Sequence, residues 1–300
     1  MMCEKVSMAP EGPQISQLIA GLWRLRHWNM QPQEVLAFVE QCVELGVTTM
    51  DHAMVYRSEE PFGQALSLKP GIRDDIEIVT KCGIRPQGFG ELGAQDVNHY
   101  DSSKTAILQS VDASLKALQT DYVDVLLLHR PDYLMNADEV VEAFDQLKAQ
   151  GKVKYFGVSN FNVHQFEYLR SMWPGLVTNQ VELSPYYKEG LESGVFEQCA
   201  GLRIRPMLWS CLAGGAVFAP DDLKGERILK TLQSLQEKYS LDSIEPIIYA
   251  WVMALPCKPL PILGTRRIDR VKTALQALAV NLTKEDWYSI WEASNGHSVP

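Results

Sequence analysis

In the stretch Thr48-Thr49-Met50-Asp51-His52-Ala53-Met54-Val55-Tyr56, a short β-rich strand ends at Asp51 and the loop after it carries Tyr56. Lys81 and His129 each close a further apolar run in the same way. In parallel α/β sheets and barrels, the chemically active groups lie at or just past the carboxyl ends of successive strands. The pattern therefore predicts that these four side chains share one face of such a sheet.

Eight apolar, β-rich runs alternate with helical patterns along the chain. The runs begin near Leu18, Val47, Ile76, Val123, Val153, Val177, Ile204 and Leu260. Apolar residues three and four positions apart mark helices that include Pro32–Leu45, Ser102–Leu118, Asp138–Gln150 and Arg267–Ala279. Strands alternating with helices imply parallel pairing, and 300 residues suit a (β/α)₈ TIM barrel, which needs roughly 250. We expect an α/β fold of this kind as a single domain over residues 1–300, although length alone also permits two smaller domains.

Two intervals between predicted strands are longer than one strand and one helix require. The first excess is the glycine-rich stretch Gly83–Tyr100, which we expect to form a long loop after the third strand. The second is an insertion after the seventh strand, Leu212–Pro259, with a loop and two helical patterns, Glu226–Tyr239 and Ile244–Leu255. Long loops in compact domains are usually functional or disordered, so both are expected to overhang the catalytic end.

The two ends of the chain extend beyond the barrel pattern. Met1–Ser16 is too short for a domain, and it is expected to close the bottom of the barrel or to be partly loose. Leu282–Ala293 predicts a C-terminal amphipathic helix with Thr283 as its N-cap and with Glu285 and Asp286 in its first turn. Residues 295–300 are expected to be frayed.

The composition excludes several functional classes. A net charge of −9 argues against a general nucleic-acid surface, because phosphate binding needs clustered cations. The six cysteines form no Cys-x-x-Cys pair, and no export signal precedes them, which favours a reduced, cytoplasmic protein. No run approaches 18 apolar residues, so a membrane span is not expected. We expect a monomer.

The four strand-end residues have a joint chemical meaning. A lysine cation favours the phenolate of a neighbouring tyrosine and so lowers its pKa from about 10, which would let Tyr56 donate a proton to a carbonyl oxygen. Asp51 is the natural partner that keeps a buried Lys81 charged, and His129 could hydrogen-bond the same carbonyl oxygen. Each residue alone is more often a cap, a packed side chain or a surface group. Together, without a strong nucleophile or a metal-ligand spacing, they indicate activation of a carbonyl, with a hydride supplied from elsewhere.

Several motifs, taken in this order, resemble the aldo-keto reductases, the NADP(H)-dependent (β/α)₈ family. They are Asp51-His52-Ala53-Met54-Val55-Tyr56, Val79-Thr80-Lys81, Leu126-Leu127-Leu128-His129-Arg130-Pro131-Asp132, Gly151-Lys152-Val153-Lys154-Tyr155-Phe156-Gly157-Val158-Ser159-Asn160-Phe161, Asn179-Gln180-Val181-Glu182 and Gly264-Thr265-Arg266-Arg267. The resemblance runs from about Leu18 to Ala279. The opening segments Ala20–Arg24 and Trp28–Met30 suggest a bacterial subgroup of poorly assigned substrate.

The resemblance implies roles for individual residues. Tyr56 would be the general acid, Lys81 and Asp51 would tune it, and His129 would orient the substrate carbonyl. The nicotinamide carboxamide of NADP(H) would be held by Ser159, Asn160 and Gln180, and Trp209 would stack on the nicotinamide ring. Ser210 and Leu212 would contact the pyrophosphate, Thr265 and Arg270 the 2′-phosphate, and Arg266 would lie near the adenine. The remaining residues of the implied cofactor site are Gly21, Trp23, Asp51 and Gly264.

Two departures from the family pattern bear on these roles. Many members place an acidic residue and an asparagine at the adenine amine, whereas this chain has Thr273 and Ala274 there. After Lys81, the pair Cys82-Gly83 replaces the tryptophan of many eukaryotic members, which predicts a more open substrate pocket. The arginines at 266, 267 and 270 begin a predicted helix, where cations oppose the helix dipole, so we expect a phosphate to compensate them.

The sequence thus predicts an NADPH-dependent oxidoreductase that reduces an aldehyde or ketone, a small-molecule carbonyl substrate, to an alcohol. The alternative is a cofactor-binding regulatory or partner protein with slow turnover, which an intact set of four residues does not exclude. A metal-dependent barrel hydrolase would require ligands that we do not find in the sequence.

Overall fold

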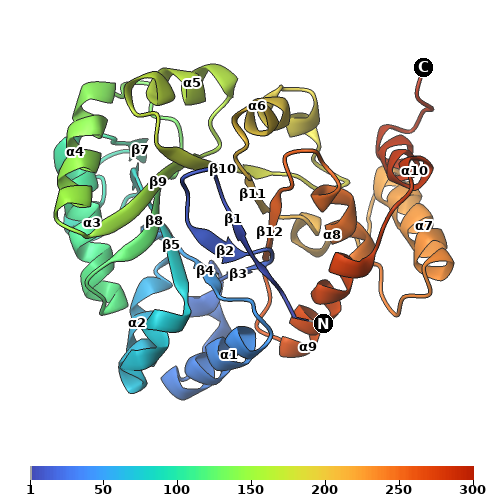
Figure 1. Ribbon diagram of the computed structural model, residues 1–300, viewed down its shortest axis with the longest axis horizontal. Helices are drawn as coiled ribbons and strands as arrows, with labels where there is room; N and C mark the ends of the chain where they lie inside the picture. The colour runs from blue at the N-terminus through green and yellow to red at the C-terminus, as the bar shows by residue number, and fades with distance from the viewer. Residues whose placement is uncertain (1) are drawn as a thin grey trace.

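Eight parallel strands close into a barrel in the computed structural model, which describes residues 2–300 (Figure 1). Around the barrel the strands are β3 (Ile19–Gly21), β4 (Thr49–Asp51), β5 (Glu77–Cys82), β8 (Val123–Leu128), β9 (Val153–Ser159), β10 (Leu176–Glu182), β11 (Met207–Trp209) and β12 (Leu260–Leu263), which pairs with β3. The predicted TIM barrel is confirmed.

One predicted strand begins later than expected. The seventh apolar run starts at Ile204, but β11 starts at Met207. The backbone N–H of Arg205 instead donates to the carbonyl oxygen of Met8, and the carbonyl oxygen of Arg205 accepts from the Thr178 hydroxyl. The backbone of Arg205 therefore anchors the N-terminal segment and does not take part in the strand pairing of the barrel.

Helices surround the barrel in a ring (Figure 1). They are α1 (Pro32–Glu44), α2 (Glu59–Leu68), α3 (Lys104–Leu118), α4 (Ala137–Ala149), α5 (Val163–Met172), α6 (Val195–Leu202), α8 (Glu245–Met253) and α9 (Ile268–Leu275), with α7 (Leu223–Lys238) and α10 (Lys284–Asn295) beside the ring. Short 3₁₀ turns are η1 (Leu25–Trp28), η2 (Met54–Tyr56), η3 (Pro70–Asp75), η4 (Gly90–Leu92), η5 (Glu189–Leu191), η6 (Ala213–Gly215) and η7 (Gln276–Ala279). The predicted helices are confirmed within a few residues at their ends.

The predicted C-terminal helix is α10, and its N-cap is Thr283 as expected. The Thr283 hydroxyl accepts from the backbone N–H of Asp286, whose carboxylate accepts from the backbone N–H of Thr283. The rings of Trp251 in α8 and Trp287 in α10 stack at 5.2 Å, and the indole N–H of each donates to the other's carbonyl oxygen at 3.0 Å. This reciprocal contact fixes α10 against the core, where α7 also packs on it (Figure 1).

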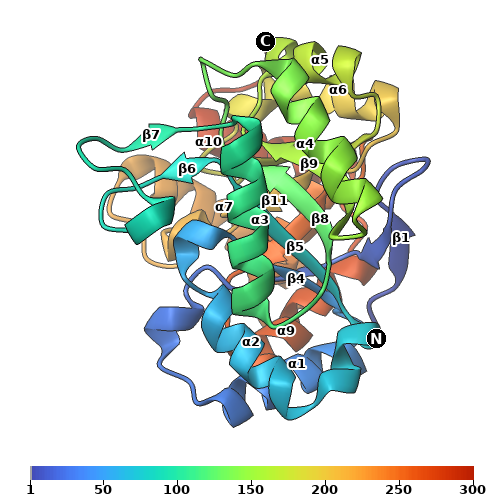
Figure 2. The ribbon, with the colours of Figure 1, turned by 90° about the vertical axis from the view of Figure 1, so that its left-hand side faces the viewer.

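Two small antiparallel hairpins lie at opposite ends of the barrel (Figure 2). At the amino end of the strands, β1 (Lys5–Ser7) pairs with β2 (Gln14–Ser16) and closes the bottom, as expected. At the other end, β6 (Ile84–Arg85) pairs with β7 (His99–Tyr100) within the predicted long loop. That loop is therefore held at its base by a short ladder.

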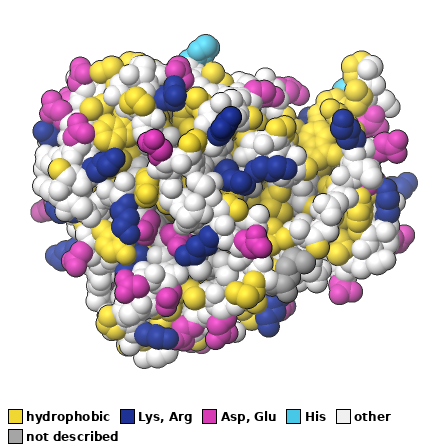
Figure 3. Space-filling model, viewed as in Figure 1, with side chains coloured by type: hydrophobic (Ala, Val, Ile, Leu, Met, Phe, Trp, Pro, Cys, Tyr) yellow, Lys and Arg dark blue, Asp and Glu magenta, His cyan; other side chains and the backbone are white. Residues whose placement is uncertain are grey.

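Charged side chains are mixed on the face that Figure 1 shows. Lysine and arginine side chains of the described residues are interspersed there with aspartate and glutamate (Figure 3). No helix of the described chain is long and apolar enough to cross a membrane.

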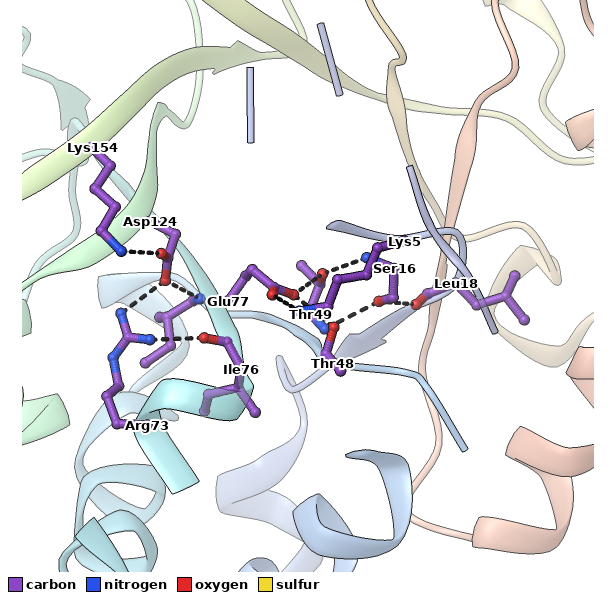
Figure 4. Close-up of polar contacts among 11 residues, drawn as sticks. Lys5, Ser16, Leu18, Thr48, Thr49, Arg73, Ile76, Glu77, Asp124 and Lys154 are labelled. Atoms are coloured by element: carbon purple, nitrogen blue, oxygen red, sulfur yellow. Dashed lines mark hydrogen bonds and ion pairs between the residues drawn. The ribbon is translucent and has the colours of Figure 1, made fainter. Parts of the chain in front are cut away.

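Buried carboxylates tie the bottom hairpin to the barrel (Figure 4). Glu77, at the start of β5, accepts from the hydroxyls of Thr48 and Thr49 at 2.7 and 3.0 Å and from the ammonium of Lys5 at 2.6 Å. Since Lys5 belongs to β1, one carboxylate holds the hairpin and two barrel strands in register.

A second carboxylate, that of Asp124 in β8, is only 9 % exposed and joins three donors. It accepts from Arg73 Nη2 at 2.8 Å, from Lys154 Nζ at 3.0 Å and from the backbone N–H of Ile78 at 2.9 Å (Figure 4). Removing one member of a buried charge network leaves the others unpaired in a poorly solvated place. Asp124 is therefore expected to be a main stabilising residue of the barrel's amino end.

Substituting Asp124→Ala is expected to lower the free energy of unfolding by about 3 kcal/mol or more, because Arg73 loses its buried partner. The matched control is Asp112→Ala. Asp112 pairs with Lys152 at 2.6 Å but is 61 % exposed, so its loss is expected to cost less than about 1 kcal/mol. Urea denaturation of both variants measures the difference, and equal losses would contradict a special role for Asp124.

The fully buried His52 makes folding sensitive to acid. Its Nδ1 lies 2.9 Å from the Ser58 hydroxyl, its Nε2 has no partner among residues 2–300, and its ring packs on Phe62 at 4.4 Å. Burial, with a contribution from the Lys81 cation, lowers the pKa of His52 to about 3.

A histidine whose pKa is depressed in the folded state stabilises the fold above its unfolded pKa of about 6.5, and this stability is lost as the pH falls toward 3. For His52 alone, the free energy of unfolding is expected to fall by about 2 kcal/mol between pH 7 and pH 5. His52→Gln should reduce that fall, whereas His164→Gln on exposed α5 should not. Denaturation at several pH values would disprove this if both variants behaved like the parent protein.

Candidate active site

A cavity of about 470 Å³ opens at the carboxyl ends of the barrel strands. Of the predicted site residues, it is lined by Gly21, Trp23, Asp51, Tyr56, His129, Ser159, Asn160, Gln180, Trp209, Ser210, Leu212, Gly264, Thr265 and Arg270. Lys81 lies behind Asp51, fully buried, and Arg266 lies outside the cavity wall. Both predicted insertions reach the cavity, one through Ile84 and the other through Gly214, Gly215 and Phe218.

The four strand-end residues meet at the floor of this cavity. Lys81 Nζ donates to both carboxylate oxygens of Asp51, at 2.8 and 2.9 Å, and to the carbonyl oxygen of His52 at 2.6 Å. Tyr56, carried by η2, places its ring 4.9 Å from Lys81 Nζ and its hydroxyl oxygen 3.3 Å from His129 Nε2. They come together because β4, β5 and β8 are neighbours in the barrel.

The electrostatics of Tyr56 differ from the sequence-based expectation. Lys81 does favour the phenolate, but burial of the phenol raises the pKa of Tyr56 by more than the cation lowers it. The expectation of a lowered pKa is therefore wrong, because the sequence does not reveal how far packing around the phenol limits its contact with water. Tyr56 keeps its proton at neutral pH.

His129 and Lys81 have clear charge states. Burial and the positive charges of Lys81 and Arg130 hold the pKa of His129 well below its usual range, so the imidazole is neutral. Burial disfavours the Lys81 cation, but Asp51 and Tyr56 outweigh it and the pKa of Lys81 is raised. The site thus presents a protonated phenol, a neutral imidazole and a lysine cation.

Asn160 organises the wall between β9 and β11. Its amide nitrogen donates to the Ser159 hydroxyl at 2.8 Å and to the carbonyl oxygen of His129 at 3.3 Å, and its amide oxygen accepts from the indole of Trp209 at 3.1 Å. Asn160 has a φ of 61°, in the left-handed region that asparagine tolerates better than most residues. This turn aims the side chain across the cavity.

Two further wall positions owe their identity to close packing or to an unusual backbone. At Gly21, a Cβ would come 2.5 Å from Ile262 Cγ2, so glycine is needed for β3 to approach β12. Ser210, just after β11, has a φ of 56°, which is uncommon for a serine and turns the chain out of the strand beside Leu212. Gln180 in β10 donates its amide to Asp51 Oδ1 at 2.9 Å and so links the opposite wall to the ion pair.

The arginines just before α9 and in its first turn already have partners inside the protein. Arg270 pairs with Glu245 through Nε at 2.9 Å and Nη2 at 2.5 Å, and Arg267 pairs with Asp269. Arg266 donates to the carbonyl oxygen of Trp28 at 3.0 Å. The expected need for a phosphate to compensate these cations is therefore wrong, since nearby carboxylates and a carbonyl already compensate them.

The sequence reasoning missed several residues that line the cavity, among them two arginines. Arg24 and Arg130 both line the cavity, and neither forms an ion pair with a residue of the described chain, 2–300. Arg24 Nε is also buried without a hydrogen-bond partner. Each arginine directly follows a predicted site residue, Trp23 or His129, which was the only available signal.

Neither a metal-binding cluster nor a disulfide is present in the part of the chain that the structure covers. Residues 2–300 contain no group of three or more His, Cys, Asp or Glu side chains placed to hold a metal ion. All six cysteines are free and buried.

The chain is similar to known oxidoreductases in sequence and to a solved aldo-keto reductase in fold. The chain is 44 % identical over 303 residues to oxidoreductase YdhF of Escherichia coli K12, with complete coverage of both chains. It is 38 % identical over 291 residues to a 6-dehydroglucose reductase of Agrobacterium fabrum, covering 95 % of this chain and 96 % of that one. The fold matches that of the thermostable aldo-keto reductase Tm1743, solved with the inhibitor epalrestat, with a TM-score of 0.78 at 23 % identity over 96 % of this chain and 99 % of that chain.

The model of the aldo/keto reductase family matches residues 17–295, which include every barrel strand and every wall of the cavity. The chain therefore belongs to the aldo/keto reductase family, whose members are oxidoreductases that act on carbonyl compounds.

Proposed function

We propose that this protein reduces an aldehyde or ketone to an alcohol with NADPH, and that Tyr56 gives its proton to the carbonyl oxygen. The observation that carries the proposal is the placement of the Tyr56 hydroxyl 3.3 Å from His129 Nε2, beside the buried pair of Lys81 and Asp51. A carbonyl oxygen between the phenol and the imidazole could accept a hydrogen bond from each. Such donors stabilise the negative charge that the oxygen gains during reduction.

The charge states favour Tyr56 over His129 as the proton donor. A neutral imidazole with a depressed pKa is a poor acid at pH 7, so His129 orients the carbonyl through a hydrogen bond. The phenol is protonated at that pH, and the Lys81 cation 4.9 Å from its ring stabilises the phenolate that remains after transfer. Asp51 keeps Lys81 charged and fixed in place.

The residues of the cavity fit nicotinamide adenine dinucleotide phosphate, whose reduced form, NADPH, would supply the hydride. Asn160, Ser159 and Gln180 offer amide and hydroxyl groups suited to a carboxamide, and Trp209 offers an aromatic face in the same wall. At the far end, Arg24 has a buried Nε without a hydrogen-bond partner among residues 2–300, and its Nη2 points near Gly264, which suits a phosphate oxygen. Thr265 and Arg270 remain our assignment for the 2′-phosphate. The six free, buried cysteines support a reducing, cytoplasmic setting.

The substrate is a small carbonyl compound. Because one relative is named a 6-dehydroglucose reductase, a sugar that carries an aldehyde belongs in the first substrate panel, beside simple aldehydes, ketones and quinones.

Tyr56→Phe is expected to lower kcat for aldehyde reduction by about 10²–10⁴-fold, because it removes only the proton donor. The dissociation constant for NADPH, measured by fluorescence titration, should stay within a few-fold of the parent value. Retained turnover in this variant would show that Tyr56 is not the acid. If the parent protein binds NADPH but reduces no carbonyl in the panel, the alternative of a cofactor-binding regulatory protein is favoured.

Arg270→Met is expected to weaken NADPH binding by about tenfold or more while leaving NADH binding nearly unchanged, because only NADPH carries the 2′-phosphate. Glu245→Gln is the matched control, since it breaks the ion pair with Arg270 but keeps the guanidinium. Titration of each variant with both cofactors measures the preference. Equal weakening of NADPH and NADH by Arg270→Met would mean that Arg270 acts only through its contact with Glu245.

A further inference from the structure

The charged groups around the cavity do not balance. Two carboxylates line it, those of Asp51 and Glu245, and each already has a cation, Lys81 or Arg270. Arg24 and Arg130 also line the cavity, and no ion pair or side-chain hydrogen bond joins either guanidinium to a residue of the described chain. The cavity is therefore locally positive in a protein whose net charge is −9.

The two free guanidinium groups lie at different ends of the cavity. A Cβ built on Gly264 would come 3.8 Å from Arg24 Nη2, which places Arg24 at the end assigned to the cofactor phosphates. Arg130 instead directly follows His129 and lies 5.8 Å from the ring of Trp209. Within residues 2–300, Arg130 is thus the cavity cation at the reacting end that has no ion-pair partner.

Arg130 is close enough to act on the reacting groups electrostatically. Its charge contributes to lowering the pKa of His129, and it opposes the rise that burial causes in the pKa of Tyr56. Burial raises the pKa of the Glu182 carboxyl, and the Arg130 cation offsets part of that rise. Glu182 forms no ion pair with Arg130 and does not line the cavity.

A half-buried guanidinium without a partner is poised to bind an anion. Its planar fork of N–H donors matches the oxygens of a carboxylate, sulfonate or phosphate group, and such charge-assisted bonds are stronger in a partly water-excluded cavity. Ile84 and Phe218 give the same cavity apolar walls, which reduce competition from water.

We propose that Arg130 is a specificity-determining residue that binds an anionic group of the substrate, so that the preferred substrates are aldehydes or ketones that also carry an acidic group. The inference rests on the proposed carbonyl reduction at Tyr56. Arg130 gives the substrate a second point of attachment, which orients the carbonyl group between Tyr56 and His129.

The test compares matched substrates with and without the charge. With NADPH, kcat/KM for 4-carboxybenzaldehyde is expected to exceed that for the isosteric 4-formylbenzamide by about tenfold or more, and succinic semialdehyde should likewise exceed butanal. Arg130→Met should abolish this preference by lowering kcat/KM much more for the acids than for their neutral analogues, and Arg130→Lys should restore part of it. Arg170→Met, which removes an arginine from an exposed pair on α5, is the charge-matched control and should change neither value.

Two kinetic outcomes would overturn the proposal. One is an absence of acid preference in the parent protein. The other is a loss in Arg130→Met that is equal for acid and amide, because Arg130 would then support the reaction without recognising an anion. A large rise in the dissociation constant for NADPH in Arg130→Met would also overturn it, since Arg130 would then belong to the cofactor site.

A binding measurement separates this proposal from the proposed function. Calorimetric titration of the NADP⁺-loaded protein should show tighter binding of benzoate than of benzamide, and Arg130→Met should remove the difference. If this result is found while no aldehyde is reduced, the anion subsite stands and carbonyl reduction fails. If benzoate binds no better than benzamide, the anion subsite is wrong, whatever the protein reduces.

Discussion

The buried ion pair between Lys81 and Asp51 is the interaction around which the cavity is arranged. Lys81 is fully buried, and its three ammonium hydrogens match the three acceptors around it, the two carboxylate oxygens of Asp51 and the carbonyl oxygen of His52. A buried charge is tolerated when its partner and its hydrogen bonds are complete. The pair therefore fixes a positive charge at the carboxyl ends of β4 and β5, where the cavity begins.

Other parts of the wall are positioned relative to that pair. Gln180 of β10 donates to the same carboxylate, so the ion pair connects strands on two sides of the barrel. Tyr56 lies over Lys81 and meets His129, whose carbonyl oxygen in turn accepts from Asn160. A loss at Lys81 would thus leave the buried carboxylate of Asp51 without its cation, although Gln180 would still donate to it, and would remove the cation beside the phenol. Stability and chemistry depend here on the same contact.

The fold and the core of the site could be read from the sequence, because both follow from simple spacing. β-rich runs separated by helical patterns specify a parallel barrel, and polar residues that close such runs must lie at one end of it. The pKa of Tyr56 could not be read, since it depends on how far packing removes the phenol from water. The ion pair of Arg270 with Glu245 joins residues on two different helices, α9 and α8, and no local sequence pattern predicts it. Arg24 and Arg130 have no spacing signal, and only the three-dimensional count of charges shows that neither has an ion-pair partner among the described residues 2–300.

The most direct test of the central claim is a crystal structure of the protein with NADP⁺ and a bound aldehyde or its alcohol product. The reacting oxygen is expected within hydrogen-bonding distance of both the Tyr56 hydroxyl and His129 Nε2, with Lys81 still paired to Asp51. An oxygen bound away from Tyr56, with another side chain as its nearest proton donor, would contradict the assignment of Tyr56 as the acid.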